Sequence, residues 1–248
     1  MKLYDNTANE YDVRQNNPST RHLRKWEEYV IKRFAKGKVL DIGCGTGYHM
    51  SFLKSLGMDA IGVDISTEML LSNNHRNLIR ADANRLPFME KSFDTVICMF
   101  STLNMLDEKA IEEMSFVLKE KGNLIISVSS IWDKKCPEFL AKFNTMNSEE
   151  HMKRKTVHIS KNILNMKLFT KNGLVQLFNK YGFTLSKFYG IFIYQRPYWG
   201  RFEQFPLSGR IKLWLDWMQL YSDLGAMYIY IFSKNNPKQA TEIYLNNL

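Results

Sequence analysis

The sequence predicts an α/β fold of the doubly wound, Rossmann-like type, in which helices cover both faces of a mostly parallel sheet. Short apolar runs alternate with amphipathic segments from residue 19 to residue 130, and the connections between them are short. A glycine-rich turn follows the first apolar run, and each of the first three runs carries an acidic residue at its end. This order is typical of repeated strand–helix–strand units, which bind ligands at the carboxyl edge of the sheet.

The first predicted helix runs from about Ser19 to Ala35. Ser19 or Thr20 can cap its amino end, apolar residues recur at helical spacing within it, and Gly37 stops it. The first strand is expected at Lys38–Ile42, a short apolar run that is typical of a buried strand. The sheet is therefore expected to begin only after a helical amino-terminal segment.

The next elements continue the alternation of apolar and amphipathic segments. In chain order we expect an apolar-faced segment at Met50–Leu56, a strand at Met58–Val63, a helix opening at Thr67–Leu71, a weak strand at Leu78–Ala81, a strand at Phe93–Met99, a helix at Glu108–Leu118 and a strand at Asn123–Val128. Five strands joined by short crossovers predict a parallel sheet over this part of the chain.

The pattern changes after residue 130. Periodicity weakens between Ser130 and Leu168, which indicates an insertion. A helix at Thr170–Tyr181 and a strand at Phe183–Tyr189 follow, and a last strand at Met227–Phe232 is expected to pair antiparallel with the strand before it as a closing hairpin. We divide the chain into an amino-terminal helix and lid (1–36), a ligand-binding core (37–130), and an insertion, cap and closing hairpin of the same domain (131–248).

Composition and charge exclude several classes of protein. The 248 residues are 45% hydrophobic and 24% charged, as in a globular domain. The formal charge of +9 is uneven: residues 1–130 carry 17 basic and 17 acidic side chains, so the excess lies entirely in residues 131–248. Acids near the amino end argue against a signal peptide, and charges interrupt the apolar stretch 211–232 that would otherwise suggest a membrane span. Three cysteines without metal-type spacing fit a cytoplasmic protein with reduced thiols and no metal site.

The glycine-rich turn lies between Asp41 and Gly47, in the segment VLDIGCGTG. Glycine is needed where the backbone turns sharply or approaches a ligand closely. A nicotinamide fingerprint would place a small residue where Tyr48 stands, so the spacing departs from that pattern. Asp41 would repel a phosphate group, and the turn therefore favours a cationic ligand.

Two further acids follow the second and third strands. Asp64 lies 21 positions after Gly43, where a carboxylate suits the two hydroxyls of a ribose. Asp82 ends the next strand in the segment RADA. Either acid could instead cap a helix, and that alternative stays open for both.

These motifs resemble those of class I S-adenosylmethionine-dependent methyltransferases, over residues 37–130. The resemblance rests on VLDIGCGTG, GVDIS, ADANRLPF and SFDTVICMFSTLNML, which occur in the family's order and at similar spacing. It implies S-adenosylmethionine as cofactor and a seven-stranded sheet with an antiparallel last strand. It also implies that the turn from Gly43 through Cys44 and Gly45 to Gly47 cradles the methionine moiety while Asp41 lies near its amino end.

The same resemblance implies roles for the residues that follow the later strands. Asp64 would hold the ribose and Ile65 would lie against the adenine. Asp82 would bind the adenine amino group and Ala83 its ring. The residues expected to line the methyl-donor pocket are Met99, Phe100 and Ser101.

The amino-terminal pattern YDNTANEYD is similar to the start of many small-molecule and quinone methyltransferases of this class, where it forms a lid over the cofactor. Tyr4 and Tyr11 would then face the ligand. The alternative is an amphipathic helix whose tyrosines pack on the core.

The sequence identifies no convincing catalytic base. Methyl transfer from a sulfonium depends mainly on positioning, so a base is needed only for a protonated acceptor. Asn104 stands where many relatives have a histidine, and it can orient an acceptor but cannot take its proton. The histidines His49, in the helix after the glycine turn, and His151, beside the basic run MKRK, are weaker candidates. His22 and His75 are expected to be solvated, and Cys44 to be a small filler.

The aromatic residues between Phe188 and Phe205 are too dense and irregular for one amphipathic helix. We interpret them as an aromatic-rich substrate cap in which Tyr194, Tyr198 and Trp199 contact the acceptor; the alternative is a subdomain core. The segment Lys212–Tyr221 is expected to be helical, with its large apolar residues on one broad side.

The expected activity is transfer of a methyl group to an apolar or aromatic small molecule. An aromatic cap and a lid favour that acceptor. The basic second half keeps a tRNA base open as an alternative acceptor, because phosphates are met by Lys and Arg. A third reading is an inactive, cofactor-binding partner subunit. We expect a monomer or homodimer.

Overall fold

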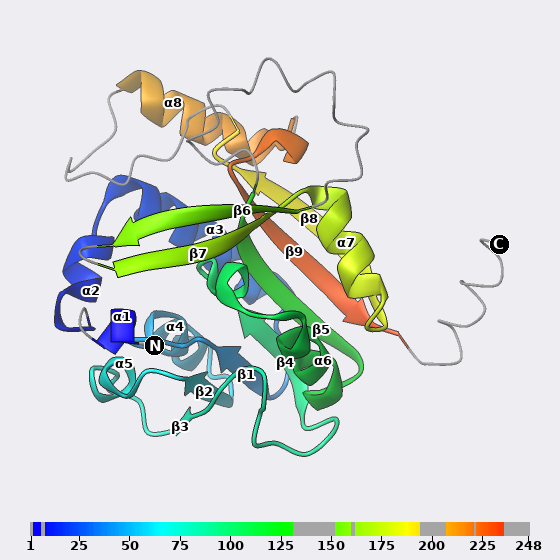
Figure 1. Ribbon diagram of the computed structural model, residues 1–248. Helices are drawn as coiled ribbons and strands as arrows, with labels where there is room; N and C mark the ends of the chain where they lie inside the picture. The colour runs from blue at the N-terminus through cyan, green and yellow to red at the C-terminus, as the bar shows by residue number, and fades with distance from the viewer. Residues whose placement is uncertain are drawn as a thin grey trace, which may run out of the picture.

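The computed structural model describes residues 2–5, 8–130, 152–159, 162–193, 207–220 and 222–235. Its centre is a seven-stranded sheet with the order β3-β2-β1-β4-β5-β9-β8 (Figure 1). Its strands are β1 (Val39–Ile42), β2 (Ala60–Asp64), β3 (Leu78–Arg80), β4 (Phe93–Cys98), β5 (Leu118–Ser129), β8 (Phe183–Ile191) and β9 (Met227–Lys234). The doubly wound α/β prediction is confirmed.

Strand direction also follows the prediction. Strands β3, β2, β1, β4 and β5 are mutually parallel, whereas β9 runs antiparallel to both of its neighbours, β5 and β8. The closing pair β8–β9 therefore forms as expected. The last strand lies inside the sheet rather than at its edge, because it is inserted between β5 and β8.

Helices cover both faces of the sheet. The helices are α1 (Lys2–Asp5), α2 (Ala8–Gln15), α3 (Pro18–Phe34), α4 (Tyr48–Ser55), α5 (Thr67–Leu71), α6 (Glu108–Val117), α7 (Lys171–Asn179) and α8 (Leu207–Leu215). One buried cluster joins the sheet to α6 and α7, and the other joins it to α3, α4 and α8.

The two-residue period of the strands divides the core between these clusters. Along β5, Leu124 and Ile126 face α6 and α7, whereas Ile125 faces the side of α3. Along β9, Tyr228 and Tyr230 alternate with Ile229 in the same way. Both faces of these central strands are buried, which explains their continuous apolar sequence.

Most element boundaries agree with those predicted from the sequence, and α5 begins at Thr67, where a helix was expected to open. The amino-terminal cap of α3 is a correction. The side chain of Asn17, not Ser19 or Thr20, accepts a hydrogen bond from the Thr20 backbone N–H, and Pro18 occupies the first turn. Asn is as good a cap as Ser, and Pro pre-organises the first helical residue.

Two strand features were not predicted. In the core, the strand expected from Asn123 begins at Leu118. The insertion contains an antiparallel hairpin of β6 (Met152–Ile159) and β7 (Asn162–Phe169), which joins the sheet through a bridge between Ser130 and Phe169.

The prediction of one helix over Lys212–Tyr221 is wrong in its extent. Helix α8 ends at Leu215 and is followed by the short 3-10 helix η3 (Asp216–Met218). Its large residues do not share one side, because Leu213 is buried whereas Trp214 and Leu220 are exposed.

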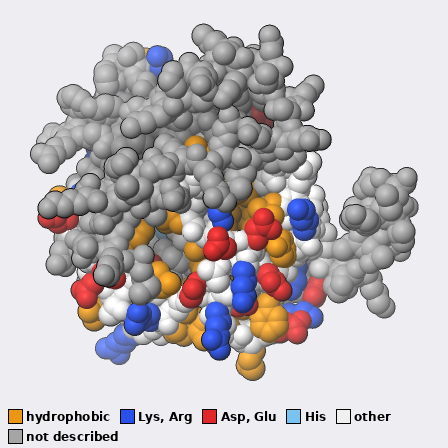
Figure 2. Space-filling model, in the orientation of Figure 1, with side chains coloured by type: hydrophobic (Ala, Val, Ile, Leu, Met, Phe, Trp, Pro, Cys, Tyr) orange, Lys and Arg blue, Asp and Glu red, His pale blue; other side chains and the backbone are white. Residues whose placement is uncertain are grey.

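The aromatic cap can be tested only in part. Tyr194, Tyr198 and Trp199 lie outside the described residues, as does His151. The neighbouring Tyr189 and Phe192 are buried with α3 and β9, so these two belong to the core. Where the described residues reach the surface in Figure 2, Lys and Arg are interspersed with Asp and Glu, in keeping with the balanced charge of the first half.

Candidate functional site

A cavity of about 330 Å³ lies at the carboxyl ends of β1, β2 and β3, beneath the amino-terminal helices α1 and α2. It has the size of a small-molecule site. Its lining residues are Tyr4, Tyr11, Ile42, Gly43, Gly45, Val63, Asp64, Ile65, Ser66, Met69, Ala81, Asp82, Ala83, Asn84, Phe100, Thr102, Met105 and Leu106. Its acids, Asp64 and Asp82, lie at or just after the ends of β2 and β3, whereas the lid and the residues after β4 contribute mainly aromatic and apolar side chains.

The glycine turn forms one wall of this cavity. Gly43, Gly45 and Gly47 all have positive φ, the left-handed region that favours glycine. A Cβ on Gly43 would meet the Thr102 side chain at 2.5 Å, and one on Gly47 would meet Asn73 at 2.4 Å. A Cβ on Gly45 would meet nothing within 4 Å. Because Gly45 lines the cavity, that open space is the space a ligand would fill.

Asp64 joins the glycine turn to the end of β2. Its carboxylate accepts hydrogen bonds of 2.9 Å from the backbone N–H groups of Gly45 and Ser66. Burial raises the pKa of Asp64, and these backbone hydrogen bonds oppose the rise. The carboxylate is thus held rigidly at the cavity wall, with a fixed direction for accepting hydroxyl donors.

Asp41 lies behind the turn and is almost fully buried. Within the described part of the chain, its Oδ2 atom has no hydrogen-bond partner. Burial raises the pKa of Asp41 to about 7, against the opposing effect of His49. An unpartnered buried carboxylate oxygen beside a glycine cradle suits a ligand with a cationic end.

Glu27 is a buried acid that the motifs do not include. One of its oxygens, Oε1, accepts hydrogen bonds from the Phe100 backbone N–H and from the Ser127 hydroxyl, and the other lies 3.0 Å from His49 Nε2. Burial alone would lower the pKa of His49, but Glu27 outweighs it and raises the pKa. A sequence signal existed: Glu27 lies on the otherwise apolar face of α3, four positions after Leu23.

Arg24 is a second residue that sequence reasoning missed. Its guanidinium lies 3.7 Å from the ring centroid of Tyr48, at the start of α4. Its charge counteracts the pKa increase that burial causes at Tyr11, a residue of the cavity wall. Arg24 therefore places a positive charge beside the helix that follows the glycine turn, although it does not line the cavity.

The third strand end is arranged as a tight turn. One oxygen of Asp82, Oδ1, accepts from the Asn84 backbone N–H at 2.9 Å, an Asx-turn rather than a helix cap. Asp82, Ala83 and Ile65 all line the cavity, on the side where the resemblance implies an adenine.

The amino-terminal helices close the cavity from above. Tyr4 and Tyr11 line it, and the Tyr4 hydroxyl donates to the Met105 sulfur at 3.2 Å. Two further contacts fasten these helices: Ser66 bonds to Asp5, and Thr46 bonds to Asp12 at 2.9 Å. Burial raises the pKa of Tyr4 to about 12, so its hydroxyl stays protonated at neutral pH.

Several residues expected at the pocket lie behind its wall. Cys44, Gly47, Met99 and Ser101 are not among the lining residues, and neither is Asp41. The thiol of Cys44 is buried, and burial raises its pKa, as expected of a filler.

The candidate base residues are engaged in the fold. Asn104 is fully buried; its amide nitrogen donates to the Ser129 and Lys167 carbonyls, and its oxygen accepts from the Ser129 N–H. His49 is buried against Glu27 and does not line the cavity. The prediction that His22 is solvated is wrong, because its ring lies 3.1 Å from the buried Asp216 carboxylate.

Comparison with known proteins agrees with this geometry. The family model described as "Methyltransferase domain" matches residues 40–126. An uncharacterised protein of Methanocaldococcus jannaschii is 35% identical over 177 residues, which cover 68% of each chain. A demethylmenaquinone methyltransferase of Paenarthrobacter aurescens is 31% identical over 153 residues, 56% of this chain; the match spans only 60% of that relative.

Solved structures share the whole fold. A Thermotoga maritima S-adenosylmethionine-dependent methyltransferase, described as a possible histamine N-methyltransferase, superposes with a TM-score of 0.62 at 21% identity and covers 95% of this chain and 99% of its own. A putative methyltransferase, solved in complex with the Trm112 activator of Haloferax volcanii, superposes with a TM-score of 0.60 at 18% identity. The match covers 95% of this chain and 97% of that one. The strand order, the glycine cradle with its open space and these matches lead to one assignment: the chain belongs to the class I S-adenosylmethionine-dependent methyltransferases.

Proposed function

We propose that the chain transfers the methyl group of S-adenosylmethionine to an apolar or aromatic small molecule bound beneath the amino-terminal lid. The observation that supports the proposal is that two parts of the cavity wall differ in chemistry. Acids and glycines lie at the strand ends, whereas Tyr4, Tyr11, Phe100, Met105 and Leu106 lie on the lid side. Such a wall supports a polar cofactor on one side and an apolar acceptor on the other.

The cofactor-binding roles are part of the proposal. Asp64 would accept hydrogen bonds from the ribose hydroxyls, and Asp82 and Ala83 would bind the adenine. Asp41 and Arg24 would face the charged amino and carboxylate groups of the methionine end. The bound cofactor supplies an activated sulfonium methyl group, and the chain supplies orientation, which can lower the barrier by roughly 7–11 kcal/mol.

The lining residues also bear on acceptor chemistry. Among the described residues that line the cavity there is no histidine, and the high pKa of Tyr4 makes it a hydrogen-bond donor rather than a base. The cavity is therefore suited to an acceptor that is already nucleophilic, such as an enolate-like carbon or an unprotonated nitrogen. The demethylmenaquinone methyltransferases among the relatives support an aromatic, quinone-like acceptor.

Transfer of a labelled methyl group tests this proposal. Purified protein is incubated with labelled S-adenosylmethionine and either an organic extract of cells or total tRNA. We expect label in the organic extract and none in tRNA. Label in tRNA alone would replace the small molecule with a base, and label in neither fraction, despite cofactor binding, would favour an inactive partner subunit.

A further inference from the structure

One surface of the molecule combines exposed large apolar side chains with a basic border. Ile211, Trp214, Trp217, Met218 and Leu220, on α8 and the residues after it, are all substantially exposed, and Trp214 is 65% exposed. Exposed residues recur about every three positions in this segment. We call these five residues, together with the exposed Tyr29 of α3, the α8 patch.

The segment that carries the patch is held firmly to the core. Asp216 is fully buried and accepts hydrogen bonds from the backbone N–H groups of Phe192 and Ile193, at 2.8 and 3.0 Å. Its carboxylate also lies 3.1 Å from His22 Nε2 on α3. The buried carboxylate of Asp216 therefore fixes the segment after α8, in which most of the side chains that follow Asp216 are exposed.

Aromatic stacking joins the patch to α3. The ring of Trp217 stacks on that of Trp26 with centroids 3.8 Å apart and lies edge-on to Tyr29 at 5.5 Å. The exposed face of α3 therefore continues the surface that α8 begins. Figure 1 shows α8 at the end of the molecule opposite β3 and α5.

The exposed charged residues of the two helices that carry the patch, α3 and α8, are basic. Every charged side chain of α3 that is exposed is basic, and these residues are Arg21, Lys25, Lys32 and Arg33. Arg210 and Lys212 on α8 are exposed too, as is Lys187, which lies 5.9 Å from the ring centroid of Tyr189 beneath Tyr29. Among the described acids of this region, Glu27 and Asp216 are buried and Glu28 is half-buried beside Tyr48, whereas Asp223 is exposed and pairs with Lys171.

We propose that the α8 patch docks the protein on the surface of an anionic membrane. Tryptophans with aliphatic residues inside a basic rim are the features of interfacial segments, which bury their apolar face at the headgroup boundary. Two basic faces would repel each other in a symmetric dimer. Ile211, Met218 and Leu220 offer no ring on which RNA bases could stack. Among the described residues, no helix has the length and apolar composition of a membrane span.

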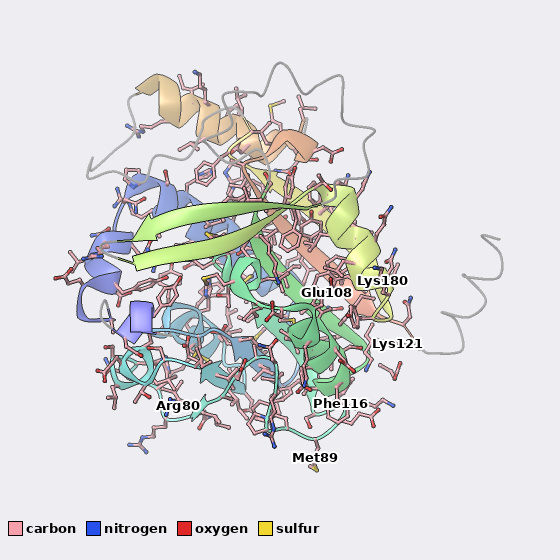
Figure 3. The ribbon with its side chains drawn as sticks, in the orientation of Figure 1. Arg80, Met89, Glu108, Phe116, Lys121 and Lys180 are labelled. Carbon is pink, nitrogen blue, oxygen red and sulfur yellow. The ribbon has the colours of Figure 1, made fainter. Side chains whose placement is uncertain are left out.

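Vesicle flotation of the full-length protein tests the proposal. Vesicles of phosphatidylcholine with phosphatidylglycerol should carry the protein, and those of phosphatidylcholine alone should carry much less. Trp214→Ala combined with Met218→Ser should reduce flotation about tenfold, and Lys25→Gln should reduce it roughly fivefold. The matched controls are Met89→Ser and Lys121→Gln, which alter exposed residues distant from α8 and should leave flotation unchanged (Figure 3).

Other outcomes would overturn the proposal. Equal flotation of the patch and control variants would do so. So would a dimer in solution that the Trp214 variant dissociates, or tRNA binding that Lys25→Gln weakens while flotation is unchanged. Cofactor affinity, measured on each variant, separates this proposal from the proposed function, because docking can fail while the cofactor still binds.

Discussion

At the scale of single residues, the glycine turn and the carboxylate of Asp64 together set the geometry of the cavity wall, because Gly45 and Asp64 are joined by a hydrogen bond and both line the cavity. The left-handed φ of Gly43 and Gly45 favours glycine, and an acid at a strand end commonly caps a helix or binds a ligand, so these positions could be predicted from the sequence. Glu27 stood out in the sequence only as an acid on the otherwise apolar face of α3, and Arg24 did not stand out. Their partners depend on how α3 packs against β5, the residues after β4 and α4, which no local pattern of the sequence encodes.

Asp64 provides the first residue-scale prediction. Asp64→Ala should weaken binding of S-adenosylmethionine by about 1–3 kcal/mol, because a charged acceptor for the ribose is lost. Asp59→Ala is the matched control, since that exposed acid precedes the opposite end of β2. Calorimetry should show normal affinity for the control, and an unchanged affinity for Asp64→Ala would refute the ribose role.

Asp41 predicts a particular pH dependence of stability. Burial raises its pKa to about 7, whereas an unfolded aspartate has a pKa of about 3.9. Between these values the folded state holds a proton that the unfolded state has lost, so the free energy of unfolding falls as pH rises from about 4 to about 7. Asp41→Asn removes this loss, which is at most about 4 kcal/mol.

Urea unfolding of wild type and Asp41→Asn at several pH values measures this effect. As pH rises from about 4 to about 8, the free energy of unfolding of the variant should rise relative to that of the wild type. The variant should also bind S-adenosylmethionine more weakly. Parallel stability curves for the two proteins would show that Asp41 is ionised throughout this interval.

At the scale of elements, strands with a strong apolar run and helices with a clear cap were predictable. The hairpin β6–β7 was not, because basic residues occupy successive positions in Met152–Ile159 and hide the two-residue period. The cap of α3 was misplaced by two or three residues for another reason. Asn17, Ser19 and Thr20 are all residues that favour this position, and only the backbone decides among them.

The lid provides a prediction at this scale. Asp5→Ala combined with Asp12→Ala should remove the contacts of α1 and α2 with Ser66 and Thr46 and so weaken cofactor binding by loosening the cover of the cavity. Global stability should change little, because exposed and half-buried polar contacts contribute about 1 kcal/mol or less each. Calorimetry and thermal melting measure the two quantities, and limited proteolysis reports opening of the lid.

The replacement Glu10→Ala serves as the control for the lid. Glu10 lies on α2 as well, but it is exposed and pairs with Arg14 of the same helix. It should leave cofactor affinity unchanged. If the double variant binds as tightly as this control, α1 and α2 do not act as a lid.

At the scale of the whole molecule, charge is distributed unequally between the two halves of the chain. The balanced first half forms the glycine cradle and the acids of the cavity, whereas the excess of basic residues lies in the second half. Where the structure describes that half, Arg210 and Lys212 accompany exposed apolar residues on α8. On the docking proposal, these two basic residues contribute to membrane binding and take no part in the cavity.

The central claim is that the space beside Gly45 holds S-adenosylmethionine, and one pair of variants tests it directly. Gly45 and Gly57 both have positive φ, and a Cβ on either would meet nothing within 4 Å, but only Gly45 lines the cavity. Both alanine variants therefore suffer a similar backbone strain. The measurement is the calorimetric affinity of wild type, Gly45→Ala and Gly57→Ala for S-adenosylmethionine.

We expect the wild type and Gly57→Ala to bind alike and Gly45→Ala to bind at least about tenfold more weakly, a loss of about 1.4 kcal/mol. Equal affinity for the two variants, or no binding to the wild type, would contradict the account.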